Sequence, residues 1–177
     1  ALIALAIEKY GRVDILVNNA GVGTAVPATH ETPDQYRSVI ETNLMGSYWM
    51  AQEFAKANKD GGAIVNISSV LGLKPQGLPQ AAYASSKAGV IGLTRDLAAQ
   101  WTGRKNIRVN ALAPGFFPSE MSDELPKDMV NMIKMFTPAG RLGDPEELAA
   151  TLIWLVSDAS SYVTGITVPV DGGLVMP

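Results

Sequence analysis

The sequence predicts an α/β fold in which helices cover both faces of a parallel sheet. The first observation is order: helical stretches alternate with short apolar runs, each helix followed by a strand, through most of the chain. The second is composition: the apolar runs are nearly continuous, as expected of parallel strands buried on both faces. The chain has 177 residues and no internal repeat or linker, so we expect a single domain over residues 1–177.

The expected elements follow from local signals. Gly11 closes a first short helix, Thr32 and Pro33 supply an N-cap and a first turn for a long helix, and Asp144 begins the last helix. We expect helices over residues 1–10, 32–57, 81–101 and 144–157. We expect strands over residues 13–17, 63–67, 107–112 and 167–170, with a long excursion before Gly143.

Bulk composition excludes several classes of function. The net charge is −3 without a basic block, which disfavours nucleic acid as a partner. The chain has no cysteine and one histidine, so thiolate sites and multi-histidine metal sites are excluded, and we expect no metal. We place His30 in an exposed loop. No apolar run approaches the ~20 residues of a membrane span, and we expect a cytoplasmic protein.

Tyr83 and Lys87 stand four residues apart, so on a helix they share one face. A phenol has a pKa near ~10, too high for ready proton exchange at neutral pH. A lysine ammonium ~4 Å away, at an effective dielectric of ~20, favours the phenolate by about 4 kcal/mol, or about three pKa units. Tyr83 could then act as a general acid/base, with the hydroxyl of Ser69 bonding the reacting oxygen. Taken alone, this spacing is also common by chance on helices.

Three polar or glycine-containing segments directly follow predicted strands, at residues 18–21, 68–69 and 114–115. Ligands of open parallel sheets bind at the carboxyl ends of the strands. We therefore expect the ligand site at this edge of the sheet.

The chain resembles the short-chain dehydrogenase/reductase family over nearly its whole length. The order and spacing of six motifs carry this resemblance: Asn18-Asn19-Ala20-Gly21, Asn43, Asn66-Ile67-Ser68-Ser69, Tyr83-x-x-x-Lys87, Arg108-Val109-Asn110 leading to Pro114-Gly115, and Val170-Asp171-Gly172-Gly173. The resemblance implies a Rossmann-type three-layer fold and NAD(P)-dependent interconversion of a secondary alcohol and a carbonyl by hydride transfer. The sequence does not decide between NAD and NADP.

By the same resemblance, four residues form a catalytic tetrad. Tyr83 would exchange a proton with the substrate oxygen, and Lys87 would lower the pKa of Tyr83 and bond the nicotinamide ribose. Ser69 would orient the carbonyl and stabilise charge on its oxygen. Asn43 would hold a water that links Lys87 to solvent.

Two of these assignments have alternatives. Ser68 and Ser69 are adjacent, but only Ser69 is followed by two residues and a glycine, Gly72, as in the family. An isolated Asn43 in mid-helix would more often be a polar surface residue, whereas its setting in residues 41–46 matches the family and favours the functional role.

The resemblance also implies cofactor contacts. Asn18, Ala20 and Gly21 are expected near the adenosine ribose and its phosphates. Pro114, Gly115 and Ser119 are expected at the nicotinamide and its carboxamide. Ile67 and Phe117 are expected as apolar neighbours of the nicotinamide ring, and Tyr83 and Lys87 also contact the cofactor. The plain alternatives are a turn after a strand for the first group and core packing for Ile67 and Phe117.

One family feature is missing from the sequence. No Thr-Gly-x-x-x-Gly-x-Gly turn, which would bind the pyrophosphate, is present. By analogy with the family, about two to three strand–helix units would precede this sequence, so we expect a carboxy-terminal portion of the fold and an incomplete domain with an unpaired sheet edge. We hypothesise that the 177-residue chain alone does not bind NAD(P) appreciably; micromolar binding in calorimetry would refute this.

Expectations about substrate and assembly are broader. Apolar and methionine side chains gather between residues 116 and 140: Phe116, Phe117, Met121, Leu125, Met129, Met132, Met135 and Phe136. They suggest a small-molecule substrate that is partly apolar, although simple helix packing would explain them equally. Aromatic side chains on two helices (Tyr48, Trp49, Phe54 and Trp101) and the resemblance suggest a homotetramer. The alternative function is a non-catalytic binding or regulatory protein with this fold, which an intact tetrad disfavours.

Overall fold

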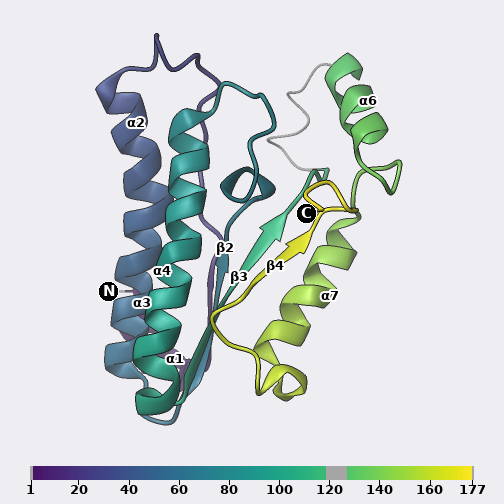
Figure 1. Ribbon diagram of the computed structural model, residues 1–177. Helices are drawn as coiled ribbons and strands as arrows, with labels where there is room; N and C mark the ends of the chain where they lie inside the picture. The colour runs from purple at the N-terminus through teal and green to yellow at the C-terminus, as the bar shows by residue number, and fades with distance from the viewer. Residues whose placement is uncertain (1, 119–126, 177) are drawn as a thin grey trace.

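The computed structural model describes residues 2–118 and 127–176 and forms a four-stranded parallel sheet in the order β1-β2-β3-β4. The strands are β1 (Ile15–Asn18), β2 (Gly62–Ile67), β3 (Ile107–Pro114) and β4 (Thr167–Val170). The predicted α/β class with a parallel sheet is confirmed (Figure 1). The register pairs Asn18 with Asn66 and Ile67 with Leu112, so the carboxyl ends of β1, β2 and β3 lie along one edge.

The helices pack on both sides of this sheet. They are α1 (Leu2–Tyr10), α2 (Pro33–Ile40), α3 (Gly46–Ala57), α4 (Ala81–Lys105), α6 (Lys127–Phe136) and α7 (Pro145–Val156), with short turns η1 (Glu41–Met45), η2 (Val70–Gly72) and η3 (Asp158–Ser160). Figure 1 shows α3 and α4 on one side of the sheet and α7 on the other, with α6 beyond the carboxyl end of β3. None of these described helices is both long and apolar enough to cross a membrane.

The expected capping signals lie where the sequence places them. Thr32 Oγ1 accepts a hydrogen bond from the Gln35 amide while the Gln35 side chain accepts one from the Thr32 amide, which satisfies two of the free donors at the start of α2. Gly11, at a φ of +82°, ends α1. Helix α6 lies within the segment expected to be an excursion, and α4 extends one turn beyond its expected end.

The core has one cluster on each face of the sheet. One joins α1, α3 and α4 to the strands: Ile3, Leu16, Ala51, Phe54, Ala55, Ile64, Leu97, Ala98, Ile107 and Val109. The other packs α7 on the sheet around Val65, Leu112 and Leu155. Because α7 packs against β2 and β3, both faces of these strands are covered.

The expected burial of the first strand on both faces is wrong. In β1, Leu16 and Asn18 are buried, but Ile15 is 46% exposed and Val17 is 37% exposed. Successive side chains of a strand point to opposite faces, and within the described residues only one face of β1 packs against a helix. The covered side of β1 is the one that faces α3.

The expected long helix over residues 32–57 is confirmed, since the backbone is helical from Pro33 to Ala57. A π-helical turn that was not expected, η1, lies between α2 and α3, and the Gly46 amide there bonds the Glu41 carbonyl five residues back. A π-turn places one extra residue in a helical turn and often occurs at functional sites. Here that turn contains Asn43, whose side chain is buried.

Candidate active site

Tyr83 and Lys87 lie on one face of the first turns of α4, beside the carboxyl end of β2. The Lys87 ammonium lies over the Tyr83 ring, 5.5 Å from its centroid, and its side chain is 4% exposed. Lys87 Nζ donates a hydrogen bond of 2.7 Å to the carbonyl oxygen of Ile67, the last residue of β2. This bond fixes the lysine between the helix and the strand end.

Ser68 and Ser69 point in different directions. Ser68 Oγ donates to the Lys87 carbonyl at 2.9 Å, so its hydroxyl is used in docking the strand end onto α4. Ser69 caps η2, where its Oγ accepts a hydrogen bond from the Leu71 amide, and its side chain lies close enough to Tyr83 to act on the pKa of that phenol. Of the two, Ser69 therefore faces the tyrosine.

Gly72 explains the spacing of that serine motif. A Cβ atom at Gly72 would lie 2.7 Å from the carbonyl carbon of Lys87 and 2.9 Å from the amide nitrogen of Ala88. Only a residue without a side chain allows η2 to rest directly on the backbone of α4. The glycine three residues after Ser69 thus brings that serine to the turn of α4 that carries Lys87.

Asn43 is held by two segments that approach it from outside its own helix. Its Oδ1 accepts from the Val22 amide, and its Nδ2 donates to the Val22 carbonyl and to Ser86 Oγ, each at 2.9 Å. Ser86 Oγ donates in turn to the Tyr83 carbonyl at 2.7 Å. Both N–H groups of the amide are engaged with protein, and the Asn43 carbonyl accepts from Ser47 Oγ at 2.7 Å. The chain from Asn43 through Ser86 ties η1 to the start of α4.

The loop after β1 passes close to these residues. A Cβ atom at Gly21 would lie 3.4 Å from Lys87 Nζ and 3.5 Å from Asn43 Oδ1. A Cβ atom at Gly23 would lie 3.3 Å from the Tyr83 ring. The two glycines therefore form a narrow cradle against the face of α4 that carries Tyr83 and Lys87.

Asn18 has a structural role that the sequence did not indicate. Its Nδ2 donates to Asn66 Oδ1 at 2.8 Å and to the Ser47 carbonyl at 3.1 Å, and Asn66 Nδ2 donates to Thr94 Oγ1 at 2.9 Å. This buried chain of amides ties β1, β2, α3 and α4 together at the edge that carries the site. Asn66 and Thr94, like Ser86, were missed; a polar residue inside an otherwise apolar strand was the available signal, because buried polar groups need partners.

The remaining expected cofactor residues lie around the same edge. Ala20 is exposed in the loop after β1, while Ile67, Pro114 and Phe117 are half-buried at the ends of β2 and β3. Gly115 donates its amide to the Val170 carbonyl, and a Cβ there would lie 2.8 Å from the Cα of Asp171, so close packing against the end of β4 requires this glycine. Ser119, Met121 and Leu125 lie outside the described residues.

Burial shifts the pKa values of Tyr83 and Lys87 toward the neutral forms. Desolvation raises the pKa of Tyr83, opposed by the neighbouring Ser69 hydroxyl, and desolvation lowers the pKa of Lys87 to about 8. The expected lowering of the Tyr83 pKa by Lys87 is therefore wrong for the protein alone. The ammonium lies over the ring and bonds the Ile67 carbonyl, and burial of the phenol is the larger effect.

Comparison with known proteins identifies this arrangement. A family profile described as enoyl-(acyl carrier protein) reductase matches residues 1–175. The 3-oxoacyl-[acyl-carrier-protein] reductase FabG of Thermotoga maritima is 43% identical over 99% of this chain and 71% of its own length. The chain belongs to the short-chain dehydrogenase/reductase family. Members are NAD(P)-dependent oxidoreductases that act on alcohol or carbonyl groups, and so is this protein.

Two further relatives show the range of the family around this chain. The acetoacetyl-CoA reductase of an Acinetobacter strain is 44% identical over 99% of this chain and 71% of its own length. The crystal structure of a gluconate 5-dehydrogenase from Burkholderia cenocepacia, in complex with NADP and tartrate, superposes with a TM-score of 0.93 at 37% identity. This match covers 97% of this chain and 68% of that one. The short-chain dehydrogenase fold, with NAD or NADP as cofactor, is thus shared with proteins that differ in substrate.

The residues present fit the nicotinamide half of such a cofactor. Among the described residues, the Ile67 carbonyl is the one acceptor of the Lys87 ammonium, so two N–H groups of that ammonium remain for a ligand. The cradle formed by Gly21 and Gly23 would be closed by side chains at either position. A buried cation with unused donors, beside a loop that needs small residues, suits a polyhydroxyl group such as ribose.

Proposed function

We propose that this protein interconverts a secondary alcohol and a carbonyl, with Tyr83 as the general acid/base. Tyr83 gives its hydroxyl proton to the substrate oxygen during reduction and takes it back during oxidation. NAD(P), when bound, supplies or accepts the hydride.

The other tetrad residues act on Tyr83 and on the substrate oxygen. The hydroxyl of Ser69 bonds the same oxygen and stabilises the charge that develops there. Lys87 holds the ribose and replenishes the Tyr83 proton, with a pKa of about 8 that suits exchange near neutral pH. Asn43 fixes Val22 and Ser86, and its carbonyl, with a second lone pair, is the candidate site for the relay water expected from the family.

The observation that carries this proposal is the joint placement of Ser69, Tyr83 and Lys87. A serine hydroxyl faces a half-buried tyrosine, and a buried lysine lies over the same ring, all at the carboxyl ends of parallel strands. A merely structural tyrosine has no need of a buried cation beside it, because burying a charge is costly. The non-catalytic alternative does not account for that cost.

Replacing Tyr83 by phenylalanine tests the assignment. The Tyr83→Phe variant loses the transferable proton and should show turnover reduced by ~10²–10⁴-fold, while cofactor affinity changes little. The measurement, in the enzyme that carries this chain, is steady-state reduction of a panel of carbonyl substrates with NADH and NADPH, together with cofactor titration. Tyr36→Phe, at an exposed position of α2, is the matched control and should leave turnover unchanged. Wild-type turnover by the Tyr83 variant would exclude the proposed role.

We further propose a partly apolar substrate. The described residues of the segment between β3 and α7 carry Phe116, Phe117, Met129, Met132, Met135 and Phe136, and the last three are exposed. Such side chains favour an acyl chain over a sugar acid as the group beyond the reacting carbon. The names of two relatives, a 3-oxoacyl and an acetoacetyl reductase, are consistent with this class.

A homotetramer in the cytoplasm is the proposed state of the enzyme. Trp49 is exposed on α3, and a groove between α3 and α4 is lined in part by Tyr48, Leu93 and Trp101, whereas Phe54 faces the core. Exposed aromatic groups beside a groove are typical of subunit interfaces. Sedimentation analysis of the purified protein checks the tetramer.

A further inference from the structure

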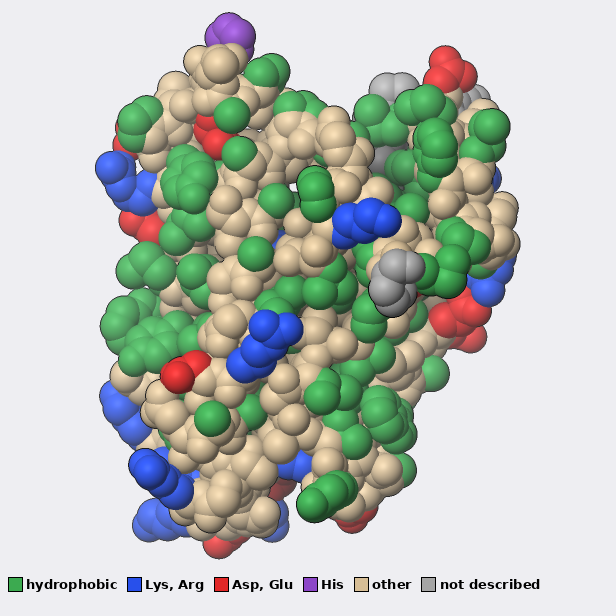
Figure 2. Space-filling model, viewed as in Figure 1, with side chains coloured by type: hydrophobic (Ala, Val, Ile, Leu, Met, Phe, Trp, Pro, Cys, Tyr) green, Lys and Arg blue, Asp and Glu red, His purple; other side chains and the backbone are tan. Residues whose placement is uncertain are grey.

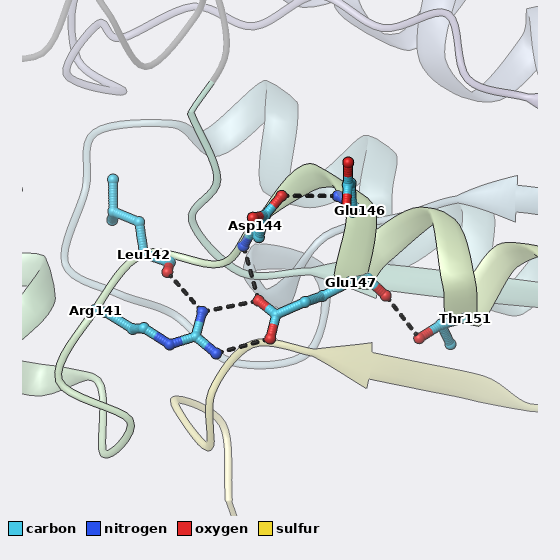
Figure 3. Close-up of polar contacts among 6 residues, drawn as sticks. All are labelled: Arg141, Leu142, Asp144, Glu146, Glu147 and Thr151. Carbon is cyan, nitrogen blue, oxygen red and sulfur yellow. Dashed lines mark hydrogen bonds and ion pairs between the residues drawn. The ribbon is translucent and has the colours of Figure 1, made fainter.

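The loop from Arg141 to Glu147, which leads into α7, is closed by a bidentate ion pair (Figure 3). Arg141 Nη2 donates to Glu147 Oε1 at 2.7 Å, and Nη1 donates to Oε2 at 2.8 Å. Nη1 also donates to the Leu142 carbonyl at 3.1 Å. Two parallel bonds fix the direction of both side chains as well as their separation.

The same carboxylate also caps α7. Glu147 Oε2 accepts from the Asp144 amide at 2.8 Å, and Asp144 Oδ1 accepts from the Glu146 amide at 3.0 Å (Figure 3). The hydrogen bonds from Arg141 and then from the Asp144 amide lower the pKa of Glu147 to about 2, so the carboxylate is ionised at any physiological pH. One carboxylate therefore joins the loop to the first helical turn through three hydrogen bonds.

Gly143, inside this loop, touches the chain that leaves β3. Its amide donates to the Phe116 carbonyl at 3.0 Å. A Cβ atom at Gly143 would overlap the Phe117 ring, with Cζ at 2.6 Å and Cδ1 at 2.8 Å. The ring thus rests on the bare Cα of the glycine, and no other residue type leaves that space.

The Phe117 ring has open space beside it. It lines a cavity of about 120 Å³ together with Phe116, Leu142 and Val170, among other residues. Packing does not enclose the ring on that side, whereas Gly143 lies directly against it. Phe117 follows the carboxyl end of β3, where the ligand of an open parallel sheet binds.

We propose that the loop over residues 141–147 is a positioning element of the active site. The Arg141–Glu147 pair holds Gly143 in place, Gly143 positions the Phe117 ring, and the ring fixes residues 115–118, which follow β3, against the bound reactants. Arg141, Gly143 and Glu147 are positioning residues, because they act through Phe117 without touching the reacting atoms. The positioning role rests on the proposed function, whereas the contact between Gly143 and Phe117 does not depend on it.

The test is a double-mutant cycle in the enzyme that carries this chain. Gly143→Ala displaces the ring and should reduce kcat/KM by about 10- to 100-fold, because misplacements near 1 Å cost rates of this size. Phe117→Val removes the overlapping atoms, so the double variant should recover part of the activity lost by Gly143→Ala. Gly103→Ala is the matched control: nothing lies within 4 Å of a Cβ there, and activity should not change.

Thermal unfolding of the wild type, the two single variants and the double variant supplies a second readout that needs no turnover. If Gly143 positions Phe117, the midpoint shifts of the two single changes are non-additive, and the double variant is more stable than Gly143→Ala. Additive shifts would show that Gly143 does not position Phe117, even if the enzyme is active. Non-additive shifts in a protein without dehydrogenase activity would support the contact between Gly143 and Phe117 and reject the proposed function instead.

The ion pair is tested separately. Glu147→Gln keeps the shape of the side chain but weakens the pair with Arg141, and kcat/KM should fall several-fold. Asp34→Asn breaks an exposed pair with Arg37 and is the control without effect. If Glu147→Gln and Asp34→Asn behave alike in kcat/KM, the ion pair does not position Phe117 and that part of the proposal is wrong.

Discussion

The two sides of the candidate site differ in how firmly they are held. On η1, on α4 and just after β2, Asn43, Lys87 and Ser69 are buried, and each has a hydrogen-bond partner. On α6, Met135 is 83% exposed and Phe136 is 73% exposed. Figure 2 shows hydrophobic side chains at the surface in the region that α6 occupies in Figure 1. Proton transfer needs fixed distances, whereas a surface that receives a substrate tolerates adjustable side chains.

The largest effect on stability and turnover is expected from a substitution at Gly72, on the buried side of the site. A methyl group at this position would lie within 3 Å of three backbone atoms of α4, which cannot rotate away. Gly72→Ala should destabilise the fold by roughly 2–4 kcal/mol and displace Ser69, with a loss of turnover. Urea unfolding measures the first effect. Gly92→Ala, with open space around its Cβ, is the control and should be neutral or slightly stabilising. Equal stability of the two variants would contradict the tight docking of η2 on α4.

A second prediction concerns the cost of burying Lys87. Its pKa is lowered by burial to about 8 in the folded protein from an ordinary value of 10.5. Between these pH values the unfolded lysine binds a proton that the folded one has released, so this group makes the fold more stable as pH rises through that window. Below about pH 8 its burial is destabilising.

Lys87→Met removes this pH dependence. The stability difference between wild type and variant should change by on the order of 2 to 3 kcal/mol from pH 7 to pH 10, in favour of wild type at the higher pH. Urea unfolding of both proteins at each pH measures the difference, and Lys56→Met, at an exposed site, is the control without a change. A pH-independent difference between wild type and Lys87→Met would mean that the ammonium is not desolvated.

The smallest effect on stability is expected from a substitution on α6, where the side chains are exposed. Met135→Ser on α6 removes an exposed side chain and should change the free energy of unfolding by about 0.5 kcal/mol or less. If α6 receives an acyl chain, the same change should raise KM for a 3-oxoacyl thioester more than for a sugar acid. Thr151→Ser, at a half-buried position of α7, keeps the hydroxyl that donates to the Glu147 carbonyl and is the control for both measurements. Equal KM changes for the two substrates would remove α6 from the apolar part of the substrate site.

Local signals were enough for most of the fold. Thr32 with Pro33, Gly11 and Asp144 each mark a helix end through bonds or backbone angles within a few residues, and the structure has those ends. The π-turn at Asn43 escaped prediction because its cause is distant: the buried amide bonds Val22 and Ser86, which lie 21 and 43 residues away in sequence. The helical periodicity of the sequence does not reveal those partners.

By itself the sequence determined the alternation of helices and strands and the positions of Tyr83, Lys87 and Ser69, since these depend on period, capping and motif spacing. Only the tertiary structure decided how they act together. It directed Ser68 into α4 and Ser69 toward Tyr83, and it opposed the lowering of the Tyr83 pKa that the Lys87 charge suggested. Burial and the direction of a side chain are set by neighbours that are distant in sequence, so the spacing of residues along the chain cannot supply them.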